Sequence, residues 1–323
     1  MSQKPRLLVT IPLPPKPRKT LQNIDSIEVV HWPEGEVKTS ENMAKHVQGC
    51  SGILCSVGDK ITSEVLDAAG EALKVVSTVS VGYEHIDLTA CKNRGIQVGY
   101  TPDVLTDATA DTTATLTMMA TRGISDAIAS VKDGRWGKPR AALPLGMQLP
   151  GKIIGFLGLG RIGYATALRL RAFGASQFIY HNRGTSRFAD DLGARRVEFP
   201  QLLAQSDVLI ITASLTSESR HLFRKETLAQ MKSHAVLVNT ARGGFIHQED
   251  LAEALSQGII GAAGLDVTDP EPIDPSHPLV HLPNCTILPH IGSATLETRN
   301  AMGDLALENV LNGMDGKALS TPL

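Results

Sequence analysis

The chain has 323 residues, a hydrophobic content of 42% and a formal net charge of −2. The length suggests about two domains with a sizeable core, and the near-neutral charge gives no electrostatic footprint for nucleic acid. The longest apolar runs are strand-sized, far short of the roughly 20 residues of a membrane span, so we expect neither a nucleic-acid nor a membrane partner.

The N-terminal run LLVTIPLPP is too short and too rich in proline for a secretory signal, so we expect a cytoplasmic protein. His277 and His281 are four residues apart, but Pro278 and Pro283 argue against the helix that a pair of metal ligands would need, and no metal site is expected. Apolar surroundings without CxxC spacing favour reduced core thiols for the four cysteines, Cys50, Cys55, Cys91 and Cys285.

Short apolar stretches alternate with polar, helix-like stretches through the first hundred residues. This alternation predicts βαβ units around a parallel sheet. The expected strands are RLLVTI (6–11), IEVVHW (27–32), GILCSV (52–57), LKVVSTVSV (73–81) and GIQVGY (95–100).

A long helix is then predicted from roughly Asp107 to Lys132, and a loop rich in glycine and proline over residues 134–151. A second set of six predicted strands follows, consistent with a doubly wound dinucleotide-binding fold. We also expect a helix over residues 294–312 that leads away from this second sheet. The six strands are KIIGFLG (152–158), QFIYHN (177–182), DVLIITA (207–213), HAVLVNT (234–240), GAAGLDV (261–267) and CTILPH (285–290).

The first strand of this second set leads directly into a G-x-G-x-x-G pattern, Gly158 to Gly163, which opens the next helix. A strand before the pattern and a helix after it are the context that a dinucleotide-binding loop requires. Gly158 permits the tight turn, Gly160 lets the backbone approach a pyrophosphate, and Gly163 lets helix and strand pack closely. The phosphates would meet free N–H groups at the helix N-terminus.

An NAD site expects an acidic residue at the end of the following strand, where it bonds the ribose hydroxyls. Here the strand ends in Asn182 and Arg183, and the nearest carboxylates, Asp190 and Asp191, lie further along. Arginine can pair with a 2′-phosphate, and Arg187 can help. We therefore expect NADPH to be preferred, with NADH possible at lower preference; the alternative is that Arg183 is only a solvated loop charge.

Three polar groups follow the ends of three successive predicted strands: Arg242, Glu271 and His290. Singly, each has a structural interpretation, as a helix-flanking charge, a loop charge or a half-buried histidine. Together, at the edge where the glycine loop lies, they match the reduction of a 2-oxo acid. Histidinium can supply the proton, a carboxylate can orient it and raise its pKa, and arginine can hold the substrate's carboxylate.

Three stretches around these residues resemble the signatures of the D-isomer-specific 2-hydroxyacid dehydrogenases, a resemblance that covers nearly the whole chain. They are VNTARGG (238–244), GLDV through PEP (264–272) and PHIGSAT (289–295). The stretches SVGYEHID (80–87), GYTPDVLTD (99–107) and HIGSAT (290–295) are most similar to the glyoxylate/hydroxypyruvate reductase branch, which also places a short run containing arginine at the strand end, as Asn182-Arg183 does.

The resemblance implies that Arg242 binds substrate, that Glu271 pairs with the histidine and that His290 donates the proton. It further implies that the N–H groups of Val81 and Gly82 hold the substrate carboxylate, with Ser293 in the substrate site. The residues that would line the cofactor are Gly158, Gly160, Arg161, Ile162, Gly163, Asn182, Arg183, Ser214, Thr240, Asp266 (facing the nicotinamide amide) and Gly292.

The family architecture implies a Rossmann coenzyme domain, residues 104–291, inserted into a flavodoxin-like substrate domain, residues 1–103 and 292–323. Homodimerisation through the long helix and the loop after it is also implied, and the apolar LTMMA and AIA stretches of that helix favour it. Residues 138–145 depart from the branch because no aromatic residue follows Trp136 there.

Two alternatives to an NADPH-dependent reductase of glyoxylate and hydroxypyruvate remain open. One is an NAD-dependent dehydrogenase of another D-2-hydroxy acid. The other is a non-catalytic, NAD(H)-sensing binding protein like the corepressors that share this fold; such proteins usually carry a long flexible tail, whereas this chain stops at Leu323.

Overall fold

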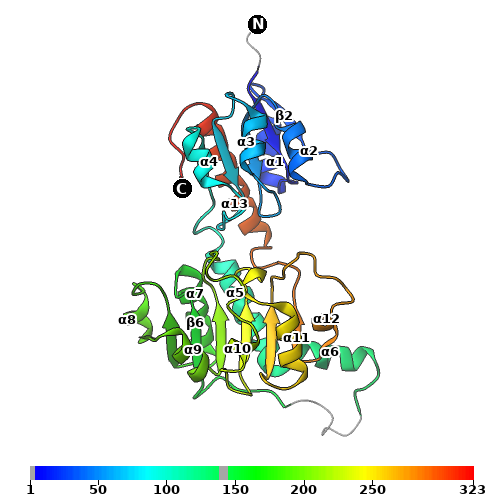
Figure 1. The fold of residues 1–323 in the computed structure, drawn as a ribbon, viewed down its shortest axis with the longest axis vertical. Helices are drawn as coiled ribbons and strands as arrows, with labels where there is room; N and C mark the ends of the chain where they lie inside the picture. The colour runs from blue at the N-terminus through cyan, green and yellow to red at the C-terminus, as the bar shows by residue number, and fades with distance from the viewer. Residues whose placement is uncertain (1–3, 138–144) are drawn as a thin grey trace. The chain divides into compact units, whose positions relative to one another are not determined.

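The computed structural model describes residues 4–137 and 145–323. It divides into two compact units, Met1–Leu105 with Ala294–Leu323, and Thr106–Ser293 (Figure 1). The chain thus leaves the first unit after residue 105 and re-enters it at 294, where the sequence predicted a crossing after 103 and a return at 292. Each unit contains a parallel sheet, which confirms the predicted α/β class with two domains.

The first unit has a five-stranded sheet in the order β2-β1-β3-β4-β5, the order of flavodoxin-like folds. All its strand pairs are parallel. Its elements are β1 (Arg6–Val9), α1 (Pro15–Gln22), β2 (Glu28–His31), α2 (Ser40–His46), β3 (Cys50–Cys55), α3 (Ser63–Ala69), β4 (Val75–Thr78), α4 (Leu88–Asn93), β5 (Gln97–Gly99) and α13 (Leu296–Met314).

Helix α13 belongs to this unit although it comes from the end of the chain. Glycines let it approach the sheet closely, because a Cβ at Gly313 would meet Val75 Cβ at 2.5 Å and one at Gly52 would meet Met314 Sδ at 2.8 Å. Ser77 Oγ on β4 also donates to Ala306 O of the helix (2.9 Å). The sequence predicted this helix, and the family architecture implied that it belongs to the domain of residues 1–103.

The second unit has a seven-stranded parallel sheet in the order β12-β11-β10-β9-β6-β7-β8. Read from its first strand, β6, this is the Rossmann order 3-2-1-4-5-6 with one strand added. Its elements are α5 (Thr106–Arg122), α6 (Ile124–Lys132), β6 (Ile153–Leu157), α7 (Arg161–Ala172), β7 (Gln177–His181), α8 (Ala189–Leu192), β8 (Arg195–Arg196), α9 (Phe199–Gln205), β9 (Val208–Ile211), α10 (Lys225–Leu228), β10 (Val236–Asn239), η2 (Gly243–Phe245), α11 (Gln248–Ser256), β11 (Ala262–Leu265), α12 (Pro278–His281) and β12 (Cys285–Ile287).

Side chains of this sheet are buried on both faces. On β9, Val208 and Ile210 join the core formed with α5 and α7, whereas Leu209 and Ile211 join the core formed with α9 and α11. Successive residues of a strand point to opposite faces, so a strand covered by helices on both sides must be apolar throughout. This requirement explains the continuous apolar runs of the sequence.

Three sequence predictions about local structure are wrong. The second sheet has seven strands, not six, because β8 is a two-residue strand of exposed arginines with no apolar pattern. The predicted helix from Asp107 to Lys132 is two helices, broken at Gly123, whose φ is +61°. A one-turn helix forms after His277 because Pro278 occupies its first position, where proline is tolerated.

The predictions for the cysteines, the loop after Trp136 and membrane spans concern the described residues to different extents. The four cysteines are free and buried, and burial raises the pKa of the Cys285 thiol to about 12. Most of the loop that lacks an aromatic residue, residues 138–144, lies outside the described residues. None of the helices in the described ranges has the length and apolar character needed to cross a membrane.

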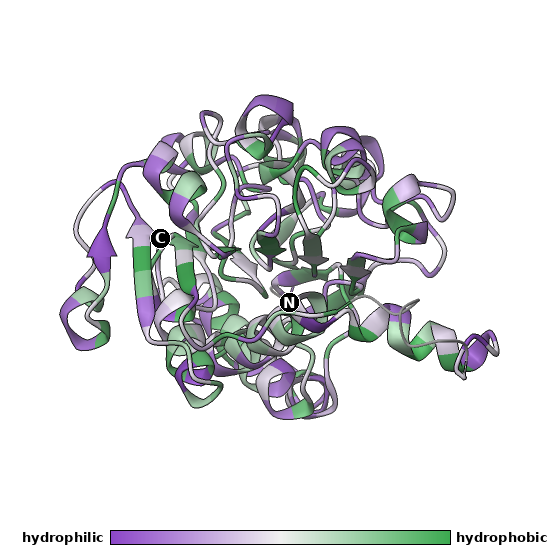
Figure 2. Cartoon of the chain, turned by 90° about the horizontal axis from the view of Figure 1, so that it is seen from below, coloured by the Kyte–Doolittle hydropathy of each residue, from purple (hydrophilic) through white to green (hydrophobic). Residues whose placement is uncertain are grey.

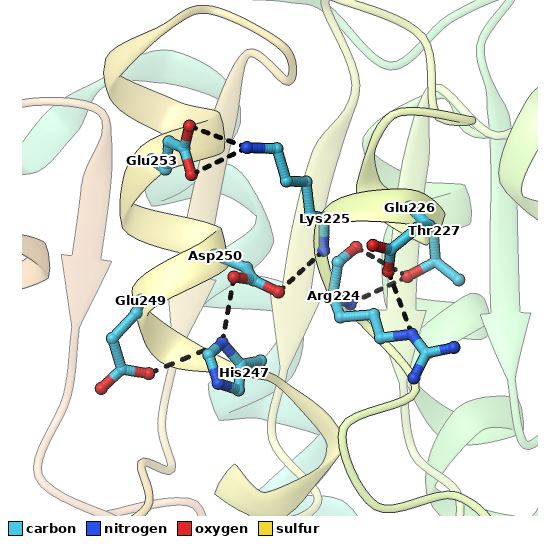
Figure 3. A network of polar contacts seen from close by, with 8 residues as sticks. All are labelled: Arg224, Lys225, Glu226, Thr227, His247, Glu249, Asp250 and Glu253. Atoms are coloured by element: carbon cyan, nitrogen blue, oxygen red, sulfur yellow. Dashed lines mark hydrogen bonds and ion pairs between the residues drawn. The ribbon is translucent and has the colours of Figure 1, made fainter.

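Surface ion pairs join α10 to the start of α11 (Figure 3). Lys225 donates its backbone N–H to Asp250 (2.9 Å) and its Nζ to Glu253 (3.1 Å), and His247 Nδ1 lies 3.1 Å from Asp250. Such exposed pairs contribute about 0–1 kcal/mol each. We interpret this network as a solvated helix contact rather than as a site.

Candidate active site

The glycine loop lies between β6 and α7, where the sheet order reverses. Gly158 has a φ of +95°, and a Cβ there would lie 2.5 Å from Ala213 N. A Cβ at Gly163 would lie 2.8 Å from Gly158 O and 3.4 Å from Phe156 on β6, so this position sets the close packing of helix on strand. A Cβ at Gly160 would meet nothing within 4 Å.

The geometry of this loop fits a dinucleotide. Gly160 is the N-cap of α7, a twelve-residue helix whose first N–H groups have no partners within the helix. Open space beside a glycine at that position lets a phosphate approach the backbone. Arg161 is exposed and Ile162 half-buried at the first two positions of the helix, so both predicted residues lie at the mouth of the loop.

The end of β7 lies beside the glycine loop because Asn182 reaches across to it. Asn182 Oδ1 accepts a hydrogen bond from Leu159 N (2.8 Å). Arg183 is exposed, and Arg196 of β8 donates through Nη2 to the carbonyl oxygens of Asn182 and Arg183 (3.2 Å each). Arginines therefore come from both β8 and the residues after β7, and sequence reasoning identified Arg183 and Arg187 but not Arg196.

Two further predicted cofactor residues lie after the next strands. Ser214 is exposed beyond β9. Thr240 follows β10, and its hydroxyl lies 2.8 Å from that of Thr113 on α5. Thr212, which the sequence analysis did not single out, ties the same edge to the glycine loop by donating to Gly158 O (2.6 Å).

His290 and Glu271 form a hydrogen-bonded pair. His290 Nδ1 lies 2.7 Å from Glu271 Oε2, and the other carboxylate oxygen accepts from Thr268 N (3.1 Å). Because a carboxylate accepts, the imidazole donates through Nδ1, and Nε2 is the nitrogen that can deliver a proton. The side chains are one-third exposed, 33% and 36%, so the pair can reach a substrate.

Asp266 holds the backbone that carries His290. Its backbone carbonyl accepts from His290 N (2.9 Å), and its two carboxylate oxygens accept from Ile291 N and Gly292 N (2.8 Å each). His290 has a φ of +53°, a left-handed conformation that non-glycine residues adopt when their surroundings impose it. Burial raises the pKa of Asp266, although the two N–H groups and His290 act in the opposite direction.

Arg242 lies three residues beyond the end of β10. Its Nη1 donates to Ala241 O (2.7 Å), and its carbonyl accepts from Nδ2 of the buried Asn239 (2.8 Å). The next residue, Gly243, packs so closely on the backbone of Thr268 that a Cβ would collide with it. The loop of Arg242 therefore packs against the loop of Glu271, and the structure brings these two predicted strand ends together.

The remaining predicted substrate residues are distributed between the units. Val81 and Gly82 are half-buried in the turn after β4 of the first unit. Ser293 is half-buried and ends the second unit. Both units of the chain therefore contribute predicted substrate residues.

Several supporting residues carried no clear sequence signal. Gln248, 6% exposed, donates to Asp269 O (2.8 Å) and accepts from Asp269 N (3.0 Å), which fixes the loop before Glu271. Thr112 on α5 donates to Gly292 O (3.3 Å). Threonine on a helix is an ordinary residue, and only the fold shows what its hydroxyl reaches.

Comparison with known proteins places these residues in a family context. Residues 114–292 match the family described as D-isomer specific 2-hydroxyacid dehydrogenase, NAD binding domain. The chain is 43% identical over 319 residues to a glyoxylate reductase/hydroxypyruvate reductase of Mus musculus, with 98% of this chain and 97% of that protein covered.

Solved structures agree with this match. A protein of Thermus thermophilus is 41% identical with a TM-score of 0.89, covering 98% of this chain and 99% of that one. An NADPH-dependent glyoxylate/hydroxypyruvate reductase from Sinorhizobium meliloti, solved in complex with NADP and malonate, is 33% identical with a TM-score of 0.87, covering 99% and 97%.

Proposed function

Because the chain belongs to the D-isomer specific 2-hydroxyacid dehydrogenase family, we propose that it reduces glyoxylate and hydroxypyruvate, with NADPH as the preferred hydride donor. The names of its relatives support this substrate class. The single observation that carries the proposal is the His290–Glu271 pair, at 2.7 Å, on strand ends of the sheet that also carries the glycine loop.

The pair supplies the proton that the reaction needs. Reduction of a 2-oxo acid adds a hydride to the carbonyl carbon and a proton to the carbonyl oxygen, giving a 2-hydroxy acid. Glu271 keeps His290 oriented through Nδ1, so that Nε2–H of the imidazolium faces the substrate and transfers its proton to that oxygen. A positioned general acid of this kind contributes about 10²–10⁴ in rate.

Arg242 and the turn of Val81 and Gly82 would bind the substrate's carboxylate and carbonyl. A guanidinium can form two parallel hydrogen bonds to a carboxylate or polarise a carbonyl oxygen. Adjacent backbone N–H groups also bind anions.

The nicotinamide cofactor supplies the hydride when bound, and the residues of the glycine loop fit its pyrophosphate. Arg183 would pair with the 2′-phosphate that distinguishes NADPH from NADH, since no carboxylate occupies this strand end. The charge-assisted bond would contribute about tenfold in affinity. Asn182, Ser214, Thr240, Asp266 and Gly292 would complete the cofactor site.

A homodimer through the predicted segment Asp107–Lys132 is part of the proposal, and its two apolar stretches, LTMMA and AIA, differ in exposure. Leu116 of the LTMMA stretch is fully buried within its own unit and packs near Gly264. Instead, Ile124, Ile128 and Val131 of α6 form an exposed apolar stripe at helical spacing. Figure 1 shows α6 projecting away from the seven-stranded sheet, and Figure 2 shows hydrophobic bands recurring along it.

Steady-state kinetics with both oxo acids and both reduced cofactors tests the proposal. We expect kcat/KM for NADPH to exceed that for NADH by about tenfold, and Arg183→Ala to raise KM for NADPH while leaving NADH nearly unaffected. Asn182→Asp keeps the acceptor for Leu159 N but loses the weak bond from Nδ2 to Leu159 O (3.5 Å), and it should shift preference toward NADH.

Arg195→Ala is the matched control, because Arg195 is an exposed arginine of β8 that donates to Gln205 instead (2.6 Å). If Arg183→Ala raises KM for NADPH and for NADH equally, Arg183 acts only as a general surface charge. If the enzyme reduces neither glyoxylate nor hydroxypyruvate, the proposed substrates are wrong.

A further inference from the structure

The turn after β4 presents two adjacent backbone donors. Within the described residues, the N–H groups of Val81 and Gly82 donate no hydrogen bond, whereas the turn is anchored on both sides of them. Val79 N donates to Cys55 O and Thr101 N donates to Ser80 O (2.9 Å each). Between these two backbone anchors, the hydrogen bond to the carbonyl of Gly82 comes from a side chain.

Three side chains form a hydrogen-bonded chain that ends on this turn. Ser80 Oγ donates to Gly82 O (2.6 Å), Thr78 Oγ1 lies 2.7 Å from Ser80 Oγ, and His85 Nε2 lies 3.0 Å from Thr78 Oγ1. Thr78 is fully buried and Ser80 is 6% exposed. The chain is thus an internal one, shielded from competing water.

The chemistry of the groups sets one direction along this chain. A carbonyl only accepts, so the single hydroxyl hydrogen of Ser80 is committed to Gly82 O. Thr78 must then donate its own hydrogen to Ser80 Oγ, and it must accept from His85, which carries a hydrogen on Nε2. Every donor therefore points toward Gly82.

We propose that Thr78 and Ser80 are positioning residues for substrate binding, and that His85 orients their hydroxyls. They anchor the Gly82 carbonyl and thereby fix the conformation of the turn whose preceding peptides carry the N–H groups of Val81 and Gly82, so that these two donors stay available to the carboxylate of a 2-oxo acid. The inference rests on the proposed function, which assigns those N–H groups to the substrate. Neither hydroxyl touches the substrate, so the expected effect is on substrate binding rather than on the chemical step.

The test uses Ser80→Ala, Thr78→Val and the double variant in the full-length enzyme. Each single variant should raise KM for glyoxylate about tenfold, the net effect of one hydrogen bond, with kcat within about twofold and Kd for NADPH unchanged. The double variant should have the same KM as the single variants, because one substitution already interrupts the hydrogen-bonded series. His85→Gln, which keeps an N–H donor, should retain a lower KM than His85→Leu.

Thr89→Ala, an exposed threonine on α4, is the matched control and should behave as wild type. Calorimetry with oxalate measures carboxylate binding without turnover, and its Kd should rise with KM. If wild type reduces neither oxo acid but Ser80→Ala still weakens oxalate, the proposed substrates fail and this inference stands.

An unchanged KM and oxalate Kd in Ser80→Ala, or multiplying effects in the double variant, would overturn the inference. Thermal melts show whether each variant folds. If Ser80→Ala does not fold, His85→Leu and His85→Gln test the inference in its place. Equal KM values for these two variants would refute the role of His85 in orienting the hydroxyls.

Discussion

Gly160→Ala should weaken dinucleotide binding by the glycine loop while leaving the stability of the protein nearly unchanged. The residue has a φ of −96° and a ψ of −159°, extended backbone that alanine can adopt. A Cβ at this position would meet no protein atom within 4 Å. The new methyl group would instead occupy the space through which the pyrophosphate is expected to approach the backbone.

The expected magnitudes follow from those two facts. Alanine is a poorer N-cap than glycine, but it also restricts the unfolded chain, which stabilises by about 0.4–1 kcal/mol. The free energy of unfolding should therefore change by less than about 1 kcal/mol. Crowding a close contact costs about 1–3 kcal/mol, so Kd for NADPH should rise by roughly 5- to 150-fold.

The assay pairs a fluorescence titration with NADPH and a thermal melt. Gly163→Ala gives the contrasting case, since its Cβ would lie 2.8 Å from Gly158 O and should lower both stability and affinity. Gly58→Ala, in open space on a loop of the first unit, is the control that should change neither. A Gly160→Ala variant that binds NADPH as tightly as wild type would refute the placement of the pyrophosphate.

Three other predictions concern binding, assembly and stability. Arg242→Ala should chiefly raise KM for the oxo acid, and an unchanged KM would count against a substrate contact. Ile128→Asp with Val131→Asp should convert a dimer into monomers in light scattering, because both side chains lie on the exposed stripe of α6; a wild type that is already monomeric at micromolar concentration contradicts the dimer. Burial opposes ionisation of Asp207, but Lys232 and its other hydrogen-bond donors hold its pKa at about 2, below the unfolded value of roughly 4. Asp207→Asn should therefore lower the free energy of unfolding by about 2 kcal/mol at neutral pH, with the difference from wild type disappearing as pH falls from 4 to 2; an equal difference at pH 2 would show that the carboxylate's charge is irrelevant.

The sequence predicted the architecture because buried parallel strands must be apolar on both faces, and such runs are visible without a structure. It could not predict β8, because the two exposed arginines that pair with β7 have no apolar pattern. The break at Gly123 was equally hidden, since the apolar pattern continues on both sides of it.

Prediction of the candidate site divided along a similar line. Residues that follow strand ends, such as His290 and Glu271, could be inferred because parallel strands bring their carboxyl ends to one edge. Residues that make hydroxyl or amide contacts, such as Thr78, Ser80 and Gln248, could not, because these contacts depend on how a turn or loop folds and leave no pattern in the sequence.

The central claim is that His290 donates the proton in the reduction of a 2-oxo acid. Asparagine tolerates the left-handed backbone of this residue but has no ionisable proton, so His290→Asn removes the acid with little strain. The most direct measurement is kcat for glyoxylate with saturating NADPH in wild type and His290→Asn. We predict a fall of about 10²–10⁴ with Kd for NADPH unchanged, and a folded His290→Asn enzyme with wild-type kcat would contradict the assignment.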